Sequence, residues 1–404
     1  MAPESATSPT LTVSKLRVAT GDSRVQHATH TPPRPLLQIL TATWIIVALL
    51  LVAPAAASGA ISAKKSIWGP MELKGASQFP IYRDLGTDIY QMNLRWSEAA
   101  PTKPARATDP RDPAYQWPKD VDFALGEGRR NGIAVALQVA STPPWANGGR
   151  EPRWAPTRVS EYADFLEAAA RRYPGVRHWM IWGEPSRSAN FLPLTPEVRT
   201  EGNPQPAPMG PEQRRAPRLY ARLLDASYSA LKRVSQRNVV IGGMTFTTGD
   251  ISVFNWIRSM RLPNGKVPRM DLYGHNPFSA RRPELESPDL GYGFADLSDT
   301  DTLIGWLDRY LRQPGGRRLR IFISELFWPT DHANLEFNFY VTRRTAAQWL
   351  SDALKITRQS SRIYSLGWFS LYDDPPRPQG DEVNRGLLDY RGRKKPAYYA
   401  YRRG

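Results

Sequence analysis

The stretch VRHWMIWGE, residues 176–184, decides the fold. An apolar run ends in a carboxylate, Glu184, with glycine before it and Pro185 after it. A short, uninterrupted apolar run is typical of a strand that is buried on both faces, as in a parallel sheet. A carboxylate at the end of such a strand is costly to bury unless it is paired or used. The segment therefore predicts a buried parallel strand that ends at a functional edge.

The same pattern recurs along the chain. Strands are expected at 66–71, 88–96, 132–141, 176–184, 238–246, 270–278, 319–328 and 362–373, with helices near 79–85, 117–130, 159–173, 216–234, 253–260, 301–311 and 342–357. Eight strand–helix units predict an α/β fold, a (β/α)8 (TIM) barrel that forms one domain over residues 62–404. The alternative is an open doubly wound sheet, but the first strand-to-helix turn lacks a glycine-rich phosphate loop.

The first 60 residues or so have a different character. Residues 1–35 are rich in Ser, Thr, Pro and Ala and are predicted to be disordered. Residues 36–53 form an uncharged apolar run, and Ala55-x-Ala57 fits a signal-peptidase site. Residues 36–57 are thus a cleaved signal peptide or an uncleaved membrane anchor through 36–53. Both alternatives predict a secreted or otherwise extracytoplasmic protein.

Composition excludes several kinds of chemistry. The chain has no cysteine, which excludes disulfides, thiolate metal sites and a cysteine nucleophile, and neither HExxH nor a P-loop occurs. We expect no metal and no cofactor. One group of acidic residues is either a calcium site or, as we prefer, part of a solvated loop: Asp373, Asp374, Asp381 and Glu382.

The net charge of +16 raises the question of a nucleic-acid partner. The arginines are scattered along the chain, and no zinc-finger spacing or RNA-binding aromatic motif is present. We therefore expect no nucleic acid, and the positive charge instead favours a negatively charged envelope surface or an acidic polymer.

Two glutamates end predicted strands of the barrel. Glu184 ends the fourth strand and Glu325 ends the seventh, in IFISELFW. Side chains at the carboxyl ends of barrel strands surround the active site. The pair is either a structural ion-pair network or a reacting pair.

These motifs resemble those of the retaining glycoside hydrolases built on the (β/α)8 barrel, a clan that includes cellulase-like and β-xylosidase-like families. That clan places an acid/base glutamate after strand four in a W-N-E-P motif and a nucleophilic glutamate after strand seven. Trp182, Glu184 and Pro185 match the first motif, and Glu325 matches the second. Further matches in order along residues 66–401 are Arg95, TPPW (142–145), His275, Trp368 and the closing stretch GLLDYRGRKKPAYYAY (386–401).

The resemblance implies an O-glycosyl hydrolase that cleaves a poly- or oligosaccharide by double displacement. Glu184 would be the acid and then the base, and Glu325 the nucleophile, about 5–5.5 Å apart in retaining enzymes. Glu184 would need a raised pKa, for which Trp182 and the apolar strand supply desolvation. Arg95 would be the cation that keeps Glu325 ionised.

Other residues are candidates for binding the sugar. Trp145, Trp182, Trp328 and Trp368 are either stacking platforms or core residues, with the stacking interpretation preferred for Trp368 because it ends an inner strand. His275 is either a hydrogen-bond donor to sugar or nucleophile, or a structural histidine.

Two departures from the clan's pattern leave alternatives open. Gly183 replaces the asparagine that holds the sugar 2-hydroxyl, and Pro277 replaces a tyrosine that contacts the nucleophile; Tyr273 or Asn276 would have to compensate for the second. A carbohydrate-binding barrel without catalysis and a transglycosylase therefore remain alternatives to the hydrolase. The long segments 187–217 and 279–298 are expected to form walls of the cleft and to carry substrate choice.

Overall fold

Parallel strands and helices alternate throughout the computed structural model, which describes residues 63–200, 202–333 and 337–404. Within these residues eight strands close into a barrel. They are β1 (Lys64–Trp68), β4 (Ile89–Arg95), β5 (Ala134–Ala140), β6 (His178–Ile181), β7 (Val239–Phe246), β8 (Leu272–Asn276), β9 (Arg320–Ile323) and β10 (Ile363–Phe369). Each pairs in parallel with the next along the chain, and β10 pairs with β1. The predicted (β/α)8 barrel is confirmed.

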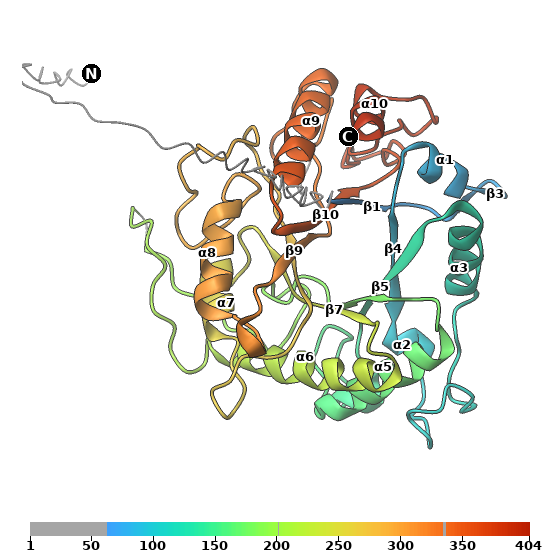
Figure 1. Cartoon of the computed structure of the whole chain (residues 1–404), viewed down its shortest axis with the longest axis vertical. Helices are drawn as coiled ribbons and strands as arrows, with labels where there is room; N and C mark the ends of the chain where they lie inside the picture. Colours follow the sequence, from blue (N-terminus) through green and yellow to red (C-terminus); the bar gives the residue numbers. More distant parts are fainter. Residues whose placement is uncertain (1–62, 201, 334–336) are drawn as a thin grey trace, which may run out of the picture. The chain divides into compact units, whose positions relative to one another are not determined.

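Helices surround the barrel, as Figure 1 shows. The longer ones are α3 (Lys119–Asn131), α5 (Val159–Arg172), α6 (Arg215–Val234), α8 (Thr300–Tyr310) and α9 (Arg343–Gln359), accompanied by α1 (Phe79–Asp84), α7 (Val253–Ser259) and the C-terminal α10 (Pro396–Arg403). Minor elements are the strands β2 (Glu72–Leu73) and β3 (Ala76–Ser77), the short helices α2 (Trp96–Ala99) and α4 (Pro144–Asn147), and the 3-10 turn η1 (Pro314–Gly316). In the part of the chain that the structure describes, no helix is both long and apolar enough to traverse a bilayer.

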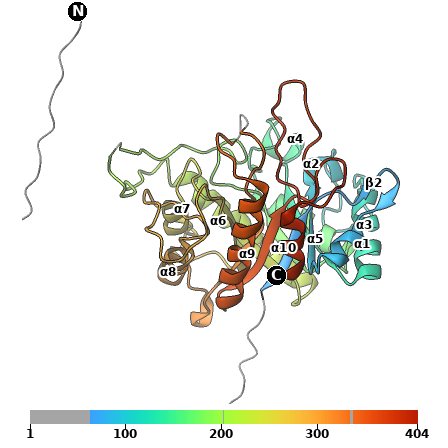
Figure 2. The ribbon, with the colours of Figure 1, turned by 90° about the horizontal axis from the view of Figure 1, so that it is seen from above.

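The expectations for residues 1–57, disorder followed by a signal peptide or anchor, lie outside the described residues. The short helices α2 and α4 directly follow β4 and β5, so they mark the carboxyl-terminal face of the barrel. Figure 2 shows them on the same side as the loop between β10 and α10. This face is where barrel enzymes carry their sites.

Two apolar layers fill the molecule. The larger lies between strands and helices, and a second cluster fills the barrel interior: Trp68, Ile89, Ala136, Met180, Ile241, Met244, Leu272 and Phe322. A small polar network lies beside the interior cluster. Ser324 Oγ donates to Gln91 Oε1 (2.8 Å) and accepts from Trp68 Nε1 (3.2 Å). The indole N–H of Trp68, the hydroxyl of Ser324 and the side-chain amide of Gln91 thus each have a hydrogen-bond partner, as is usual for buried polar groups.

Several strands are shorter than predicted. β6 ends at Ile181, not at residue 184, and β9 ends at Ile323, not at 328. In β6 the cause is local, because Trp182 has φ +67° and leaves the extended conformation. Glu184 therefore lies three residues beyond the end of β6, and Glu325 lies two residues beyond the end of β9.

A buried ion pair fastens the end of the chain to the barrel. Lys395 Nζ lies 2.7 Å from Asp373 Oδ1, and the two side chains are 3% and 2% exposed. Thr330 Oγ1 accepts a second hydrogen bond from Lys395 (2.9 Å), and Asp373 accepts one from the Gly386 N–H (2.7 Å). The pair joins the segment after β10 to the residue before α10.

Candidate active site

One cavity at the carboxyl-terminal face brings the two glutamates together. It has a volume of about 420 Å³. Its lining includes Glu184 after β6, Glu325 after β9, Arg95 at the end of β4, and Gln138 on β5. Residues from four barrel strands or their ends thus surround a single space of a size that suits a small ligand.

Glu184 is held by three donors. Its Oε2 accepts from Arg187 Nη1 (2.8 Å) and Asn190 Nδ2 (3.2 Å), and its Oε1 accepts from Asn276 Nδ2 (2.9 Å). The carboxylate is only 9% exposed, so these partners are needed to offset its loss of water. The apolar surrounding that the sequence predicted for Glu184 is incomplete, because a guanidinium and two amides also contact it.

The backbone around Glu184 is strained. Trp182 and Glu184 have φ values of +67° and +42°, in the left-handed region that costs roughly 1–3 kcal/mol for a residue with a side chain. The turn is fixed at both ends: the Trp182 N–H donates to Val139 O (2.9 Å), and the Arg187 N–H donates to Glu184 O (3.1 Å). Such strain is typical of functional sites, where the surrounding structure imposes a conformation.

Glu325 is half-buried and sits between two strand neighbours. The N–H of Ser324 donates to His275 O (3.2 Å), and the N–H of Phe369 donates to Leu326 O (3.1 Å). The backbone on both sides of Glu325 is thereby tied to β8 and β10. A Cβ on Gly367 would lie 1.9 Å from Ser324 O, so only glycine allows β10 to approach this closely.

Gln138 is a site residue that the sequence analysis did not identify. A Cβ on Gly183 would lie 2.8 Å from Gln138 Nε2, so the carboxamide of Gln138 fills the space beside residue 183. Its Nε2 donates to Asn93 Oδ1 (3.0 Å). Gln138 also lines the cavity, where it presents an amide next to Glu184. Only the pairing of β5 with β6 reveals this contact.

Arg95 lines the cavity as predicted, but its recorded ion pair is with Glu98 at 3.6 Å. Its side chain is 58% exposed. An exposed guanidinium at the end of β4 can contact a ligand, and its electrostatic effect is reduced by solvent.

Asn276 and His275, neighbours on β8, have different surroundings. Asn276 donates to Glu184, whereas the sequence analysis considered it as a partner of the other glutamate. His275 is buried, with Nε2 2.9 Å from Ala295 O and Nδ1 2.9 Å from Thr245 Oγ1. Nδ1 also lies 3.0 Å from Thr245 O, so both ring nitrogens contact groups of the protein, and burial lowers the pKa of His275 to about 4. This placement favours the structural interpretation of His275. Tyr273, the other candidate to compensate for Pro277, is fully buried and its hydroxyl lies 3.1 Å from Thr245 Oγ1.

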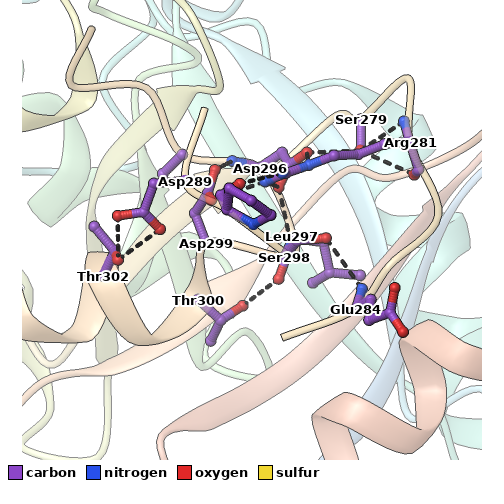
Figure 3. Close-up of polar contacts among 12 residues, drawn as sticks. Ser279, Arg281, Glu284, Asp289, Asp296, Leu297, Ser298, Asp299, Thr300 and Thr302 are labelled. Atoms are coloured by element: carbon purple, nitrogen blue, oxygen red, sulfur yellow. Dashed lines mark hydrogen bonds and ion pairs between the residues drawn. The ribbon is translucent and has the colours of Figure 1, made fainter. Parts of the chain in front are cut away.

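The segment 279–298, predicted as a second wall, is held by its own polar network (Figure 3). Arg281 Nε and Nη2 donate to Asp296 (2.8 and 2.9 Å), and Nη2 also donates to Asp299 Oδ1 (2.8 Å). Burial, together with the charge of Asp296, raises the pKa of Asp299 to about 6. None of the described residues 279–298 lines the cavity, whereas the other predicted wall, 187–217, contributes Ala189 and Asn190.

The four candidate tryptophans lie mostly in the core. Trp182, Trp328 and Trp368 are each 1% exposed, which leaves no ring face open to a sugar. Trp182 is nevertheless part of the cavity wall, and its Nε1 donates to Asn190 O (2.8 Å). Trp145 is half-buried, packs edge-on against Trp96 and donates to Ala100 O (2.8 Å). The structure thus favours the core interpretation for the first three.

The acidic residues considered for calcium each lie beside a basic side chain. Asp373 pairs with Lys395, Asp374 with Arg385, Asp381 with Arg377 and Glu382 with His332. Over the described ranges, no group of three or more histidine and carboxylate side chains is placed to hold a metal ion.

The fold and the site together define a (β/α)8 barrel with two carboxylates in one cavity at its carboxyl-terminal face. Solved structures that resemble this chain in fold include glycoside hydrolases. A family 39 glycoside hydrolase from Bacteroides cellulosilyticus WH2 superposes with a TM-score of 0.61 at 16% identity, over 85% of this chain and 64% of that one. A glucosidase from Croceicoccus marinus gives 0.57 at 14% identity, over 85% and 65%. A monomeric β-xylosidase from Caulobacter crescentus CB15 gives 0.54 at 15% identity, over 84% and 67%.

These likenesses show the fold that the chain shares with them. This chain spans under two thirds of the first two structures, 64% and 65% of their lengths. No family model matches the sequence, and no curated protein matches it.

Proposed function

We propose that the protein is a retaining glycoside hydrolase with Glu184 as acid/base and Glu325 as nucleophile. The observation that carries the proposal is that both glutamates line one cavity at the carboxyl-terminal face of the barrel. Two carboxylates flanking a sugar are the requirement of glycoside hydrolysis. The structural neighbours, named as a family 39 glycoside hydrolase, a glucosidase and a β-xylosidase, agree with this class of reaction.

The reaction would proceed in two displacements. The carboxylate of Glu325 attacks the anomeric carbon while the glycosidic C–O bond breaks, and Glu184 gives its proton to the departing oxygen. Glu184 then takes a proton from water, whose oxygen attacks the anomeric carbon and releases Glu325. Each glutamate returns to its starting state.

Gln138 would supply the amide that position 183 lacks. Its carboxamide lines the cavity beside Glu184 and is oriented by Asn93. Because Nε2 donates to Asn93, the carbonyl oxygen of Gln138 remains available as an acceptor for a sugar hydroxyl.

The ion pair between Arg187 and Glu184 favours a second candidate, a carbohydrate-binding barrel without catalysis. The guanidinium, 2.8 Å away, occupies Glu184 Oε2 in place of a substrate oxygen. In the hydrolase, the departing oxygen of the substrate must take the place of Arg187 at Glu184. The Arg187 side chain is 35% exposed, which leaves it room to move.

Hydrolysis of a panel of aryl glycosides tests the proposal. We expect turnover on at least one of them, loss of activity in Glu325→Ala, and partial rescue of Glu184→Ala by azide, an anion that attacks the anomeric carbon and releases Glu325 without needing a base. Glu72→Gln, an exposed carboxylate on β2, is the matched control and should keep full activity. Sugar binding without turnover would favour the binding barrel, longer products with added acceptor sugars would favour a transglycosylase, and wild-type turnover in both glutamate variants would refute the assigned roles.

We also propose that the protein acts outside the cytoplasm, on the strength of the apolar run at 36–53 and Ala55-x-Ala57. Fusion of residues 1–62 to a reporter that is active only after export tests this. N-terminal sequencing of the mature protein would distinguish cleavage near Ala57 from an uncleaved anchor.

A further inference from the structure

Beside the active-site cavity lies a groove rich in arginine. Two cavities of about 550 and 480 Å³ meet on the N-terminal half of α6 and share Arg215, Leu219 and Arg222 in their walls. The larger also contains Arg218 and Arg261, and the smaller contains Arg150 and Trp154. We call these joined cavities the arginine groove.

The spacing of arginines on α6 creates this surface. Arg215, Arg218 and Arg222 follow one another at helical intervals and are exposed, while Tyr220, Leu223 and Leu224 on the other face are buried in the core. Residues three, four and seven apart lie on one side of a helix. The groove therefore presents a row of guanidinium groups to solvent.

Among the described residues, one arginine of the groove forms an ion pair, with Glu212, which also lines the larger cavity. The one ion pair is a long contact of Arg215 with Glu212 at 3.9 Å, between side chains that are 66% and 76% exposed. Across the described residues, no ion pair involves Arg150, Arg218, Arg222 or Arg261. In the second half of α6, by contrast, Arg233 lies 2.8 Å from Glu167. Unpaired like charges repel one another, and a bound anion would remove that cost.

Arg261 is a partly buried arginine of the groove. It is half-buried, its Nη1 donates to Met260 O (2.8 Å), and burial lowers its pKa. A guanidinium that has lost water without gaining a carboxylate gains most from an anionic ligand, which it can contact through two parallel hydrogen bonds.

One wall separates the arginine groove from the active-site cavity, and its residues line both. The segment around Arg153 pairs with the segment around Leu192: the Leu192 N–H donates to Arg153 O (2.9 Å), and the Ala155 N–H donates to Leu192 O (2.7 Å). Arg153 and Asn190 line the active-site cavity, while their near neighbours Trp154 and Pro193 line the groove. A ligand that crosses this wall would reach both.

We propose that the arginine groove binds the anionic groups of a carbohydrate polymer whose next units extend into the active-site cavity. The inference rests on the proposed function, because that function makes the polymer a carbohydrate. The shape also favours a polymer over a membrane, since the arginines line concave spaces and a bilayer presents a flat surface. The ring of Trp154, with Arg150 stacked 4.5 Å above it, adds an aromatic face of the kind that packs on sugars.

Binding measurements on the full chain test this without requiring turnover. The probes are a carboxylated oligosaccharide, a neutral oligosaccharide of the same length, single-stranded DNA and anionic lipid vesicles. The background is Glu325→Gln, so that no probe is cleaved. The variant replaces Arg215, Arg218 and Arg222 with alanine, and the control replaces three exposed arginines elsewhere, Arg177, Arg237 and Arg312. Both variants lose the same charge, and their melting temperatures show whether each is folded.

We expect the carboxylated probe to bind about tenfold more weakly to the groove variant than to the control variant, because three exposed charge contacts of roughly 0.5 kcal/mol each are lost. Raising the salt from about 50 to about 200 mM should weaken its binding to the parent protein. Equal weakening in both variants would mean that only net charge matters and would overturn the proposal. Tighter binding of the neutral probe, DNA or vesicles would overturn the choice of ligand. Failure of hydrolysis with the binding difference intact would refute the proposed function alone.

Discussion

Gln138 occupies the place where a side chain on Gly183 would begin. A Cβ there would approach Gln138 Nε2 to 2.8 Å and Cδ to 3.0 Å. The two positions lie on neighbouring segments of the barrel, so an amide lost from one is present on the other. Glycine at 183 is thus compatible with a site that still has a carboxamide beside Glu184.

Exchanging the two positions tests this relationship. Gln138→Gly should lower kcat/KM about tenfold, the effect of one hydrogen bond of roughly 1.4 kcal/mol. Gly183→Asn alone should also lower it, because the new side chain collides with Gln138. The double variant should recover part of the loss, since the amide then has room. Independent, additive losses in kinetic assays would rule out the exchange.

Asn276 orients the proposed acid/base. Its Nδ2 donates to Glu184 Oε1 at 2.9 Å, and it is 1% exposed. Asn276→Ala should lower kcat/KM by about 10- to 100-fold, because a hydrogen bond to a charged group contributes roughly 1.5–3 kcal/mol. Asn238→Ala, a buried asparagine at the opposite end of the barrel, controls for the general cost of removing a buried amide. Equal losses of activity in both variants would assign the effect to stability.

The buried pair of Lys395 and Asp373 should matter for stability. Lys395→Met leaves Asp373 buried without its cation, and we expect a loss of about 3–5 kcal/mol in the free energy of unfolding. Adding Asp373→Leu to the same chain should recover much of that loss. Urea unfolding measures both, and a single variant as stable as the parent would show that the pair is not buried in solution.

Acidification should destabilise the fold before most carboxylates titrate. Burial lowers the pKa of both His178 and His275 from 6.5 to about 4. The unfolded chain then binds more protons than the folded one, so stability falls as the pH drops from about 6.5 towards 4, by up to roughly 3 kcal/mol per histidine. Asp299, whose pKa is raised to about 6, stabilises the folded chain as the pH falls over this range. It offsets only part of the loss, because it is one group against two histidines.

His178→Gln isolates one part of this pH dependence. His178 Nε2 lies 2.7 Å from the Tyr364 hydroxyl, and His178 is the first residue of β6, at the end of that strand away from Glu184. Urea unfolding at several pH values should show a shallower slope in the variant between about pH 4 and 6.5. Parallel curves for the variant and the parent would contradict the assignment.

Much of the fold was predictable because its signal is local. Buried parallel strands are continuous apolar runs, and eight of them between amphipathic helices leave few alternatives to a barrel. The positions of Glu184 and Glu325 in one cavity follow from that topology. The end of β6 did not, because no residue pattern records the left-handed φ of Trp182 that ends the strand.

The details of the site depend on contacts between distant segments. Gln138 meets Gly183, and Asn276 meets Glu184, only when the barrel closes. The hydrogen bond between Gln138 and Asn93 joins residues 45 apart in the sequence, and the one between Asn276 and Glu184 joins residues 92 apart. The same closure buries Trp368, for which the end of an inner strand had favoured a stacking role, and Trp328, for which stacking and core interpretations had both been open. Motif spacing locates a strand end, and packing decides which way its side chains point.

The twisted backbone at Glu184, with φ +42°, has a consequence for the history of this chain. A residue with a branched or long side chain is a poor choice there for folding alone, whereas glycine or asparagine would relax the turn. Selection for folding stability alone would therefore favour replacing the glutamate at this position. A glutamate kept there despite its cost in stability is expected if selection for activity outweighs selection for stability.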